Sequence, residues 1–203
     1  MKKKPQKNSK RSNTNTLRII GGDWRSRKLS FVDAQGLRPT PDRVRETLFN
    51  WLQGYIYGAS CLDLFAGSGI LGLEALSRGA AQVDFVEMNK SVVKQLESNL
   101  DLLNSKMKVH QQDALYYLQK YKAGNNKGNG YNIIFLDPPY RKNLLEEALE
   151  VICDKDNGLA DKNTLVYLEH ESEESFDWDK YGLKVLKQAS AGQVRCYLMC
   201  FKT

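Results

Sequence analysis

The chain has 203 residues, of which 41% are hydrophobic and 27% charged, a composition typical of a single soluble domain with a full core. No apolar run approaches the roughly 20 residues that cross a bilayer, and no signal peptide is visible. The four cysteines are scattered, which predicts reduced thiols and no metal site, so we expect a cytoplasmic protein. The net charge of +6 resides in residues 1–11, which contain six basic residues and no acid.

Residues 1–16 form a basic tail that we expect to be disordered. Such an arm favours a polyphosphate partner through counterion release, and a tail that only aids solubility fits the composition nearly as well. Residues 17–56 predict an N-terminal extension, in which strands at 17–20 and 28–32 form a β-hairpin. A helix follows, with Thr40 as its N-cap and Pro41 at its first position, and Arg43 and Arg45 are expected to project from it.

Residues 57–203 alternate between strand and helix patterns, which predicts a mainly parallel sheet covered on both faces. Strands are expected at 61–65, 82–87, 107–111, 131–136, 164–169, 183–188 and 194–201, with helices at 70–77, 90–103, 114–121 and 144–153. The last two strands form a hairpin, so one of them must run against the others. Seven strands with one reversed resemble the Rossmann-like α/β fold of S-adenosylmethionine (SAM)-dependent methyltransferases, and an ordinary dinucleotide-binding sheet is the nearest alternative.

A glycine-rich turn closes the first strand of this alternating part, in the sequence Asp63-Leu-Phe-Ala-Gly67-Ser-Gly69. Glycines there let the backbone approach a ligand at a helix N-terminus, and the spacing from Gly67 through Gly72 also fits the weak G-x-G-x-x-G pattern of NAD sites. Glu87 ends the second strand, where a carboxylate can accept both ribose hydroxyls of either cofactor.

Two further acids favour SAM over a dinucleotide. Asp63 precedes the glycines, where it would face the cationic amino group of the methionine part and would repel a pyrophosphate. Asp113 resembles the acid that accepts from the adenine amino group in SAM enzymes, and as an isolated residue it is equally suited to cap the helix that begins at Ala114. The predicted cofactor-binding residues are Asp63, Phe65, Gly67, Gly69, Glu87, Asp113 and Ala114.

The segment Asp137-Pro138-Pro139-Tyr140 follows a buried strand and must turn there, because two prolines continue neither a strand nor a helix. Its Asp137 carboxylate and Pro138 carbonyl supply two acceptors for an exocyclic NH2 group, and Tyr140 offers a stacking face for a flat base. The tetrapeptide resembles the signature of methyltransferases that modify amino groups of adenine or guanine. We therefore predict Asp137, Pro138 and Tyr140 as the catalytic residues.

Residues 18–29, 38–52 and 137–142 together resemble the RsmD family of methyltransferases, which modify guanine N2 in 16S ribosomal RNA. The resemblance runs from about Leu17 to Phe201. It implies SAM as cofactor and ribosomal RNA or a small-subunit particle as partner, and we expect a monomer. The basic residues predicted to hold the RNA are Arg18, Arg25, Arg27, Lys28, Arg38, Arg43 and Arg141.

Three alternatives stay open at the level of sequence. An adenine-N6 methyltransferase acting on DNA or RNA shares the amino-group pocket. An NAD-dependent oxidoreductase would leave Asp137-Pro-Pro-Tyr140 unexplained and would need a substrate domain. A non-catalytic RNA-binding assembly factor would need no SAM, so SAM binding separates it from the other readings.

Overall fold

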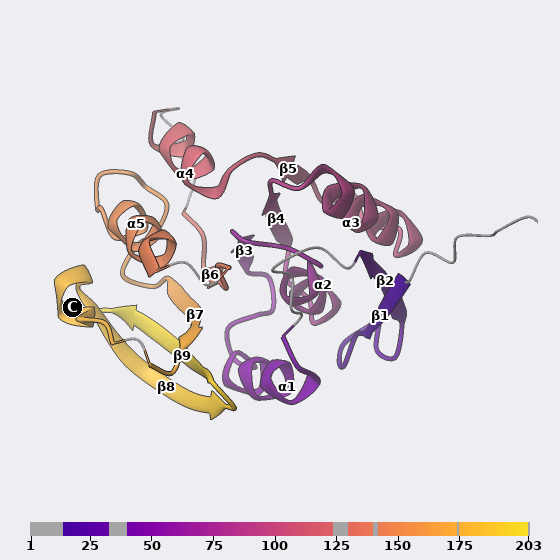
Figure 1. Cartoon of the computed structure of the whole chain (residues 1–203), viewed down its shortest axis with the longest axis horizontal. Helices are drawn as coiled ribbons and strands as arrows, with labels where there is room; N and C mark the ends of the chain where they lie inside the picture. The colour runs from indigo at the N-terminus through magenta and orange to yellow at the C-terminus, as the bar shows by residue number, and fades with distance from the viewer. Residues whose placement is uncertain (1–13, 33–39, 124–129, 140–141, 174, 203) are drawn as a thin grey trace, which may run out of the picture.

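The computed structural model describes residues 14–32, 40–123, 130–139, 142–173 and 175–202. At its centre lies a seven-stranded sheet with the order β5-β4-β3-β6-β7-β9-β8 (Figure 1). β9 is antiparallel to both of its neighbours, β7 and β8, and all other neighbouring strands in this sheet are parallel. This confirms the predicted mainly parallel sheet with one reversed strand. The strands are β3 Ser60–Asp63, β4 Gln82–Glu87, β5 Val109–Gln111, β6 Ile133–Leu136, β7 Leu165–Glu171, β8 Leu183–Ala191 and β9 Val194–Phe201.

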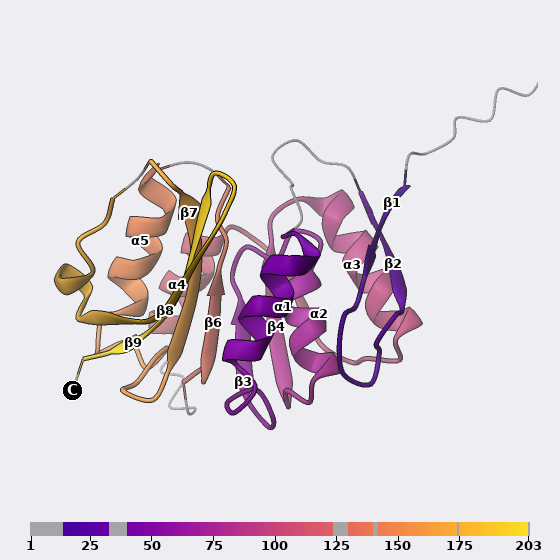
Figure 2. The ribbon, with the colours of Figure 1, turned by 90° about the horizontal axis from the view of Figure 1, so that it is seen from below.

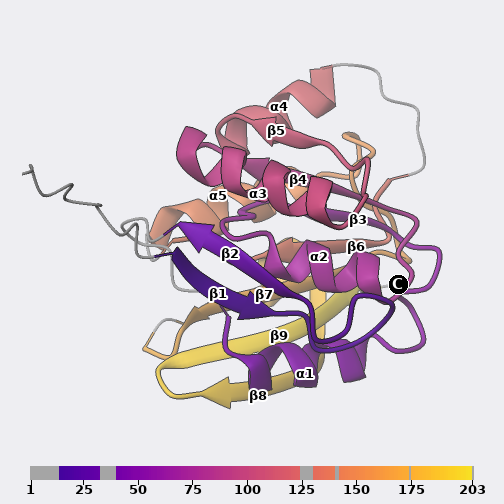
Figure 3. The same cartoon turned by 90° about the vertical axis from the view of Figure 1, so that its right-hand side faces the viewer.

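Helices cover both faces of the sheet. Figure 3 shows α1 Asp42–Trp51, α2 Ile70–Ser77 and α3 Lys90–Leu102 in front of it, while α4 Ala114–Ala123 and α5 Lys142–Ile152 lie behind. Strand β6 is apolar throughout because it is buried on both faces of the sheet. Ile133 and Phe135 belong to the core on one face, and Ile134 and Leu136 belong to the core on the other. A short 3-10 helix at Trp178–Tyr181 connects β7 to β8.

The N-terminal hairpin consists of β1 Thr14–Arg18 and β2 Lys28–Val32. It lies at the end of the molecule opposite β8 and β9 (Figure 2). Its connecting loop is fastened to α2, because Glu74 accepts hydrogen bonds of 2.8 Å from the N–H groups of Ile20 and Gly21. Gly22 has a φ of +73°, and a Cβ there would collide with the Ser77 carbonyl. Part of the distinctive N-terminal motif is therefore structural.

Two predictions for α1 are wrong. Pro41, rather than Thr40, is the N-cap, and its apolar ring cannot make a side-chain capping bond. The Thr40 hydroxyl contacts Asp137 and Glu169 instead. Arg45 does not project into solvent, since its side chain is fully buried and pairs with Asp42 and Glu74. Arg45 also donates to the carbonyls of Thr40 and Arg18. Its guanidinium thus joins α1, α2 and the hairpin.

Candidate active site at the carboxyl ends of the strands

The glycine turn after β3 adopts a conformation that requires glycine. Gly67 and Gly69 have φ values of +50° and +74°, in the left-handed region that other residues avoid. A Cβ on Gly69 would also collide with the Leu96 side chain of α3. The turn is closed by a hydrogen bond of 2.6 Å from the Gly69 N–H to the Ala66 carbonyl, and α2 starts directly after it.

Carboxylates already accept from two backbone N–H groups of this turn and the start of α2. Glu87, at the end of β4, accepts from the Gly67 N–H at 3.0 Å and from the Asn89 N–H at 2.7 Å. Asp63 accepts from the Gly72 N–H in the first turn of α2 at 3.0 Å. A pyrophosphate would need such donors and would lie against two acids, which is unfavourable. The site therefore fits a nucleoside with a positive charge better than a dinucleotide.

Asp63 is almost completely buried, with 3% of its surface exposed. Burial raises the pKa of this carboxyl to about 7, the Gly72 N–H opposes that rise, and the nearby Glu87 adds to it. Among the described residues, Asp63 forms no ion pair with a basic side chain. The arrangement is suited to a ligand that brings a positive charge.

Asp137 lies at the end of β6, one residue beyond the pairing of Leu136 with Leu168 of β7, so it is a neighbour of Glu169. Its Oδ2 atom lies 3.4 Å from the Thr40 hydroxyl. The pKa of Asp137 is well above its ordinary value, because of burial first and then the charges of Glu169 and Asp63. Three acids from β3, β6 and β7 therefore share one region at the carboxyl edge of the sheet.

The remaining predicted cofactor residues are also near strand ends. Asp113 caps α4, since its Oδ1 accepts from the Tyr116 N–H at 2.9 Å, and its side chain is exposed. Phe65 is half-buried and packs on the α4 and α5 side of the sheet, where Ala114 is 8% exposed. The capping role predicted for Asp113 is confirmed. Its contact with adenine stays a prediction, as does the cofactor-binding role of Phe65 and Ala114.

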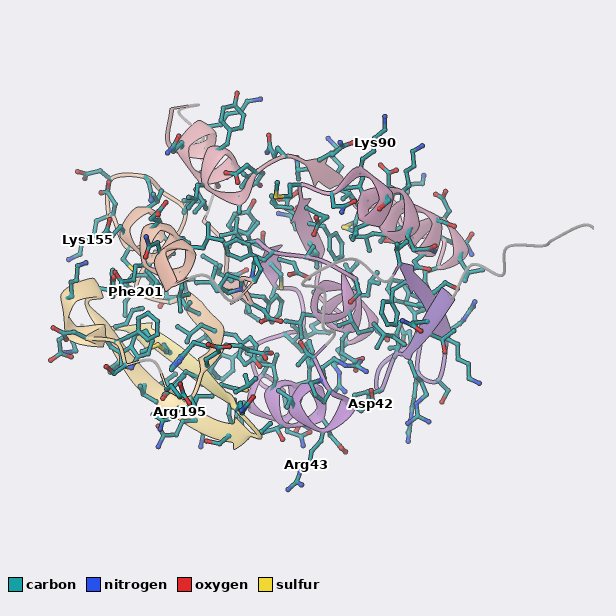
Figure 4. The ribbon with its side chains drawn as sticks, viewed as in Figure 1. Asp42, Arg43, Lys90, Lys155, Arg195 and Phe201 are labelled. Atoms are coloured by element: carbon teal, nitrogen blue, oxygen red, sulfur yellow. The ribbon has the colours of Figure 1, made fainter. Side chains whose placement is uncertain are left out.

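The predicted RNA-binding residues within the described ranges are all at the surface. Arg18, Arg25, Arg27 and Lys28 lie on the hairpin, and Arg43 extends outward from α1 (Figure 4). Arg18 forms an ion pair of 3.6 Å with Asp42. Three predicted site residues, Tyr140, Arg38 and Arg141, lie outside the described residues, as do residues 1–13 of the tail.

Two residues of this region, Thr40 and Glu169, were missed by the sequence prediction. Glu169 is 6% exposed and accepts from the Tyr167 hydroxyl at 2.7 Å and from the Thr40 hydroxyl at 3.3 Å. A signal for Glu169 was present, since it is an acid near the end of a strongly apolar strand, as are Asp63, Glu87 and Asp137. For Thr40, the local pattern of a helix start concealed the long-range contact.

In the part of the chain that the structure describes, no cluster of His, Cys, Asp and Glu could hold a metal ion. Within the same residues, no helix combines the length and the apolar character needed to cross a membrane. The four cysteines, all of which are described, form no disulfide.

Comparison with known proteins gives consistent matches over most of the chain. The family described as conserved hypothetical protein 95 matches residues 17–200. The protein named ribosomal RNA small subunit methyltransferase D of Escherichia coli strain K12 is 46% identical over 184 residues, which cover 90% of this chain and 89% of that protein. The protein of the same name from Buchnera aphidicola of Acyrthosiphon pisum is 36% identical over 203 residues, which cover 98% of this chain and 97% of that protein.

The solved structures extend this likeness to the fold. A putative methyltransferase of Escherichia coli, yhhF, has a TM-score of 0.80 and 43% identity, and the match covers 93% of this chain and 99% of that one. A putative methylase of Haemophilus influenzae has a TM-score of 0.74 and 38% identity, and the match covers 93% of this chain and 100% of that one. The predicted methyltransferase fold is thereby confirmed.

Proposed function

Because the chain belongs to the RsmD family, the family described as conserved hypothetical protein 95, we propose that it methylates the exocyclic N2 of a guanine in small-subunit ribosomal RNA, with SAM as methyl donor. The observation that carries the proposal is the meeting of Asp63 and Asp137 at one edge of the sheet, beside a glycine turn whose donors are held by carboxylates. The names of the relatives support ribosomal RNA as substrate, and the choice of guanine N2 rests on the family resemblance.

Bound SAM supplies an electrophilic methyl group on a positively charged sulfur. On the protein side, Asp63 and Glu87 would hold the ammonium group and the ribose hydroxyls. The Asp137 carboxylate and the Pro138 carbonyl would accept from the guanine NH2 and so direct its lone pair toward the methyl group. Most of the acceleration would come from this alignment, so no strong base is needed, and Asp137 receives the proton after the methyl group has arrived.

The test is transfer of tritium from labelled SAM to naked 16S ribosomal RNA, to small-subunit particles lacking the modification, and to DNA. Incorporation into either RNA form, and none into DNA, is expected. Incorporation into DNA alone would keep the chemistry and reject the substrate class. Absence of incorporation, together with no SAM binding by calorimetry, would favour a non-catalytic RNA-binding protein and would overturn the proposal.

Asp63→Asn should raise stability and weaken SAM binding together. The folded protein binds the Asp63 proton more tightly than the unfolded chain does, so wild-type stability falls as pH rises from about 4 to the folded-state pKa of about 7 and then levels off. The variant has no proton to lose, and the difference in free energy of unfolding between variant and wild type should therefore grow over this range. Loss of a charged hydrogen bond should weaken SAM binding about tenfold or more. Urea unfolding at several pH values and calorimetry measure the two effects, and equal pH dependence of both proteins would contradict the account.

Removing basic residues of the hairpin should reduce the salt dependence of RNA binding. The triple variant R25A/R27A/K28A is expected to lower the slope of log K against log salt by about 2 to 3, because each lost phosphate contact contributes about 0.7 to 0.9. The control is K155A/K162A/K184A, which removes the same charge from exposed positions, with Lys155 across the molecule from the hairpin in Figure 4. Equal slopes for the two triple variants would show that the hairpin does not contact phosphates.

A further inference from the structure

The Thr40 hydroxyl lies between two carboxyl groups from adjacent strands, the half-buried Asp137 and the buried Glu169. Its Oγ1 atom is 3.4 Å from Asp137 Oδ2 and 3.3 Å from Glu169 Oε1. Thr40 is 4% exposed and Glu169 is 6% exposed, so bulk water has little access to the contact between them. Thr40 therefore bridges the proposed catalytic acid to a second acid deeper in the protein.

A hydroxyl has one proton to donate and two lone pairs that accept. Thr40 can donate to one of the two carboxylates, and it can bond to the other only by accepting a proton from it. The three groups therefore form a path along which one proton can pass between Asp137 and Glu169. The Tyr167 hydroxyl donates to Glu169 at 2.7 Å, which stabilises the negative charge at that end of the path.

We propose that Thr40 and Glu169 carry the proton of the methylated amino group away from Asp137, a role that rests on the proposed function. The N–H bond of the cationic amine breaks and its proton bonds to Asp137. Asp137 then gives a proton from Oδ2 to Thr40 Oγ1, and Thr40 gives its own hydroxyl proton to Glu169 Oε1. Asp137 and Thr40 return to their starting states, and Glu169 ends as a neutral acid. Thr40 and Glu169 are positioning residues, and Asp137 alone contacts the base.

The electrostatics of the two acids agree with this path. Burial raises the pKa of both carboxyls, Glu169 raises that of Asp137 further, and the Thr40 hydroxyl opposes the rise at each end. A group that must accept a proton after the reaction needs such a raised pKa. With a positively charged cofactor in place, both carboxyls are favoured in the ionised form needed at the start.

Stability alone does not explain the pair, because two like charges in a buried site destabilise a fold. An apolar pair at positions 40 and 169 would avoid this cost. The proton path gives a reason for this polar contact, in which Thr40 meets Asp137, 97 residues away along the chain, and Glu169, 129 residues away.

The first test uses the cofactor-free protein and does not depend on activity. NMR of protein with 13C-labelled carboxyl groups, assigned with Asp137→Asn and Glu169→Gln, follows the two acids against pH. Glu169→Gln should lower the pKa of Asp137 by about 1 unit or more, because a like charge is lost, and Thr40→Val should raise it, because a hydrogen bond to the carboxylate is lost. Unchanged titration of Asp137 in either variant would overturn the proposal.

The second test measures methyl transfer over many turnovers against pH, because Asp137 must lose the accepted proton before it can serve the next turnover. Both variants should be slower on the plateau by about tenfold or more, and the acidic limb of the profile should move down in pH for Glu169→Gln and up for Thr40→Val. Thr40→Ser keeps the hydroxyl and should recover most of the rate lost in Thr40→Val. Thr164→Val is the matched control, since Thr164 is 1% exposed and its hydroxyl donates to the Tyr131 carbonyl, remote from the acids.

The outcomes separate this proposal from the proposed function. If wild-type protein transfers no methyl group to any RNA, the proposed function fails and the NMR titration still decides whether the two acids are linked through Thr40. If wild-type protein is active and both variants keep its rate and pH profile, the proton path is wrong and the function stands. A rate loss in Thr164→Val equal to that in Thr40→Val would reduce the effect to general destabilisation and would overturn the path.

Discussion

Replacing Asp137 with Asn should reduce kcat for methyl transfer by about 10²- to 10⁴-fold and leave the fold intact. The amide keeps the shape of the carboxyl group and can still accept from an NH2, but it lacks the negative charge that stabilises the amine as it becomes cationic. It also cannot take up the proton of the methylated amine. Because Asp137 adds a negative charge next to Glu169 and Asp63, its neutral replacement relieves repulsion. We therefore expect the melting temperature to stay the same or to rise.

Single-turnover kinetics with saturating SAM measure this effect, and calorimetry checks that SAM affinity is retained. Asp101→Asn is a suitable control, because Asp101 is an exposed acid on α3 away from the strand ends. A variant that keeps more than about a tenth of the wild-type single-turnover rate would show that the Asp137 carboxylate does not assist methyl transfer. If Asp137→Asn is slow and also no longer unfolds cooperatively, the loss of rate would reflect a folding defect. The rate would then be measured again with Asp137→Ala.

Replacing Glu74 with Ala should destabilise the protein by about 3–5 kcal/mol. Glu74 is completely buried and lies at the junction of α1, α2 and the hairpin loop. Its carboxylate accepts from the Ile20 and Gly21 backbone and pairs with Arg45 at 3.4 Å and Arg78 at 2.8 Å. Removal leaves the two backbone donors without their acceptor and takes one of two carboxylate partners from the buried Arg45, which keeps only Asp42.

Urea unfolding measures the free energy of unfolding. The control is Glu97→Ala, which removes an acid from the exposed face of α3 and should change that free energy by no more than about 0.5 kcal/mol. Should Glu74→Ala not accumulate as folded protein, Glu74→Gln keeps one acceptor and should cost about 1–3 kcal/mol. A decrease of less than about 1 kcal/mol in the free energy of unfolding of Glu74→Ala would contradict the view that this acid fastens the hairpin loop to α2.

The sheet and the acids at its edge could be predicted because their signals are local. The apolar run before Asp137 and the glycines after Asp63 each reveal a strand end without knowledge of the rest of the fold. Alternation of strands and helices then brings such ends to one edge, which is why Asp63, Glu87 and Asp137 meet there. The boundaries expected for the tail, the extension and the main domain remain predictions.

The residues that were misjudged have partners far away in the sequence. Thr40 precedes proline in a pattern typical of an N-cap, yet its hydroxyl contacts acids 97 and 129 residues away. Arg45 is a charged residue on a helix, and such residues are usually exposed, but Glu74, 29 residues later, completes a buried ion pair. Tertiary contacts decided both cases against the local rule.

The most direct test of the proposed activity is the identity of the methylated nucleoside. Small-subunit ribosomal RNA, labelled by wild-type protein and tritiated SAM as naked RNA and as particles, would be digested and its nucleosides separated by liquid chromatography and mass spectrometry. We predict label in N2-methylguanosine at a single position, and its loss with Asp137→Asn. Label in N6-methyladenosine instead would contradict the guanine-N2 assignment and would point to the adenine alternative that shares the Asp137-Pro138 pocket.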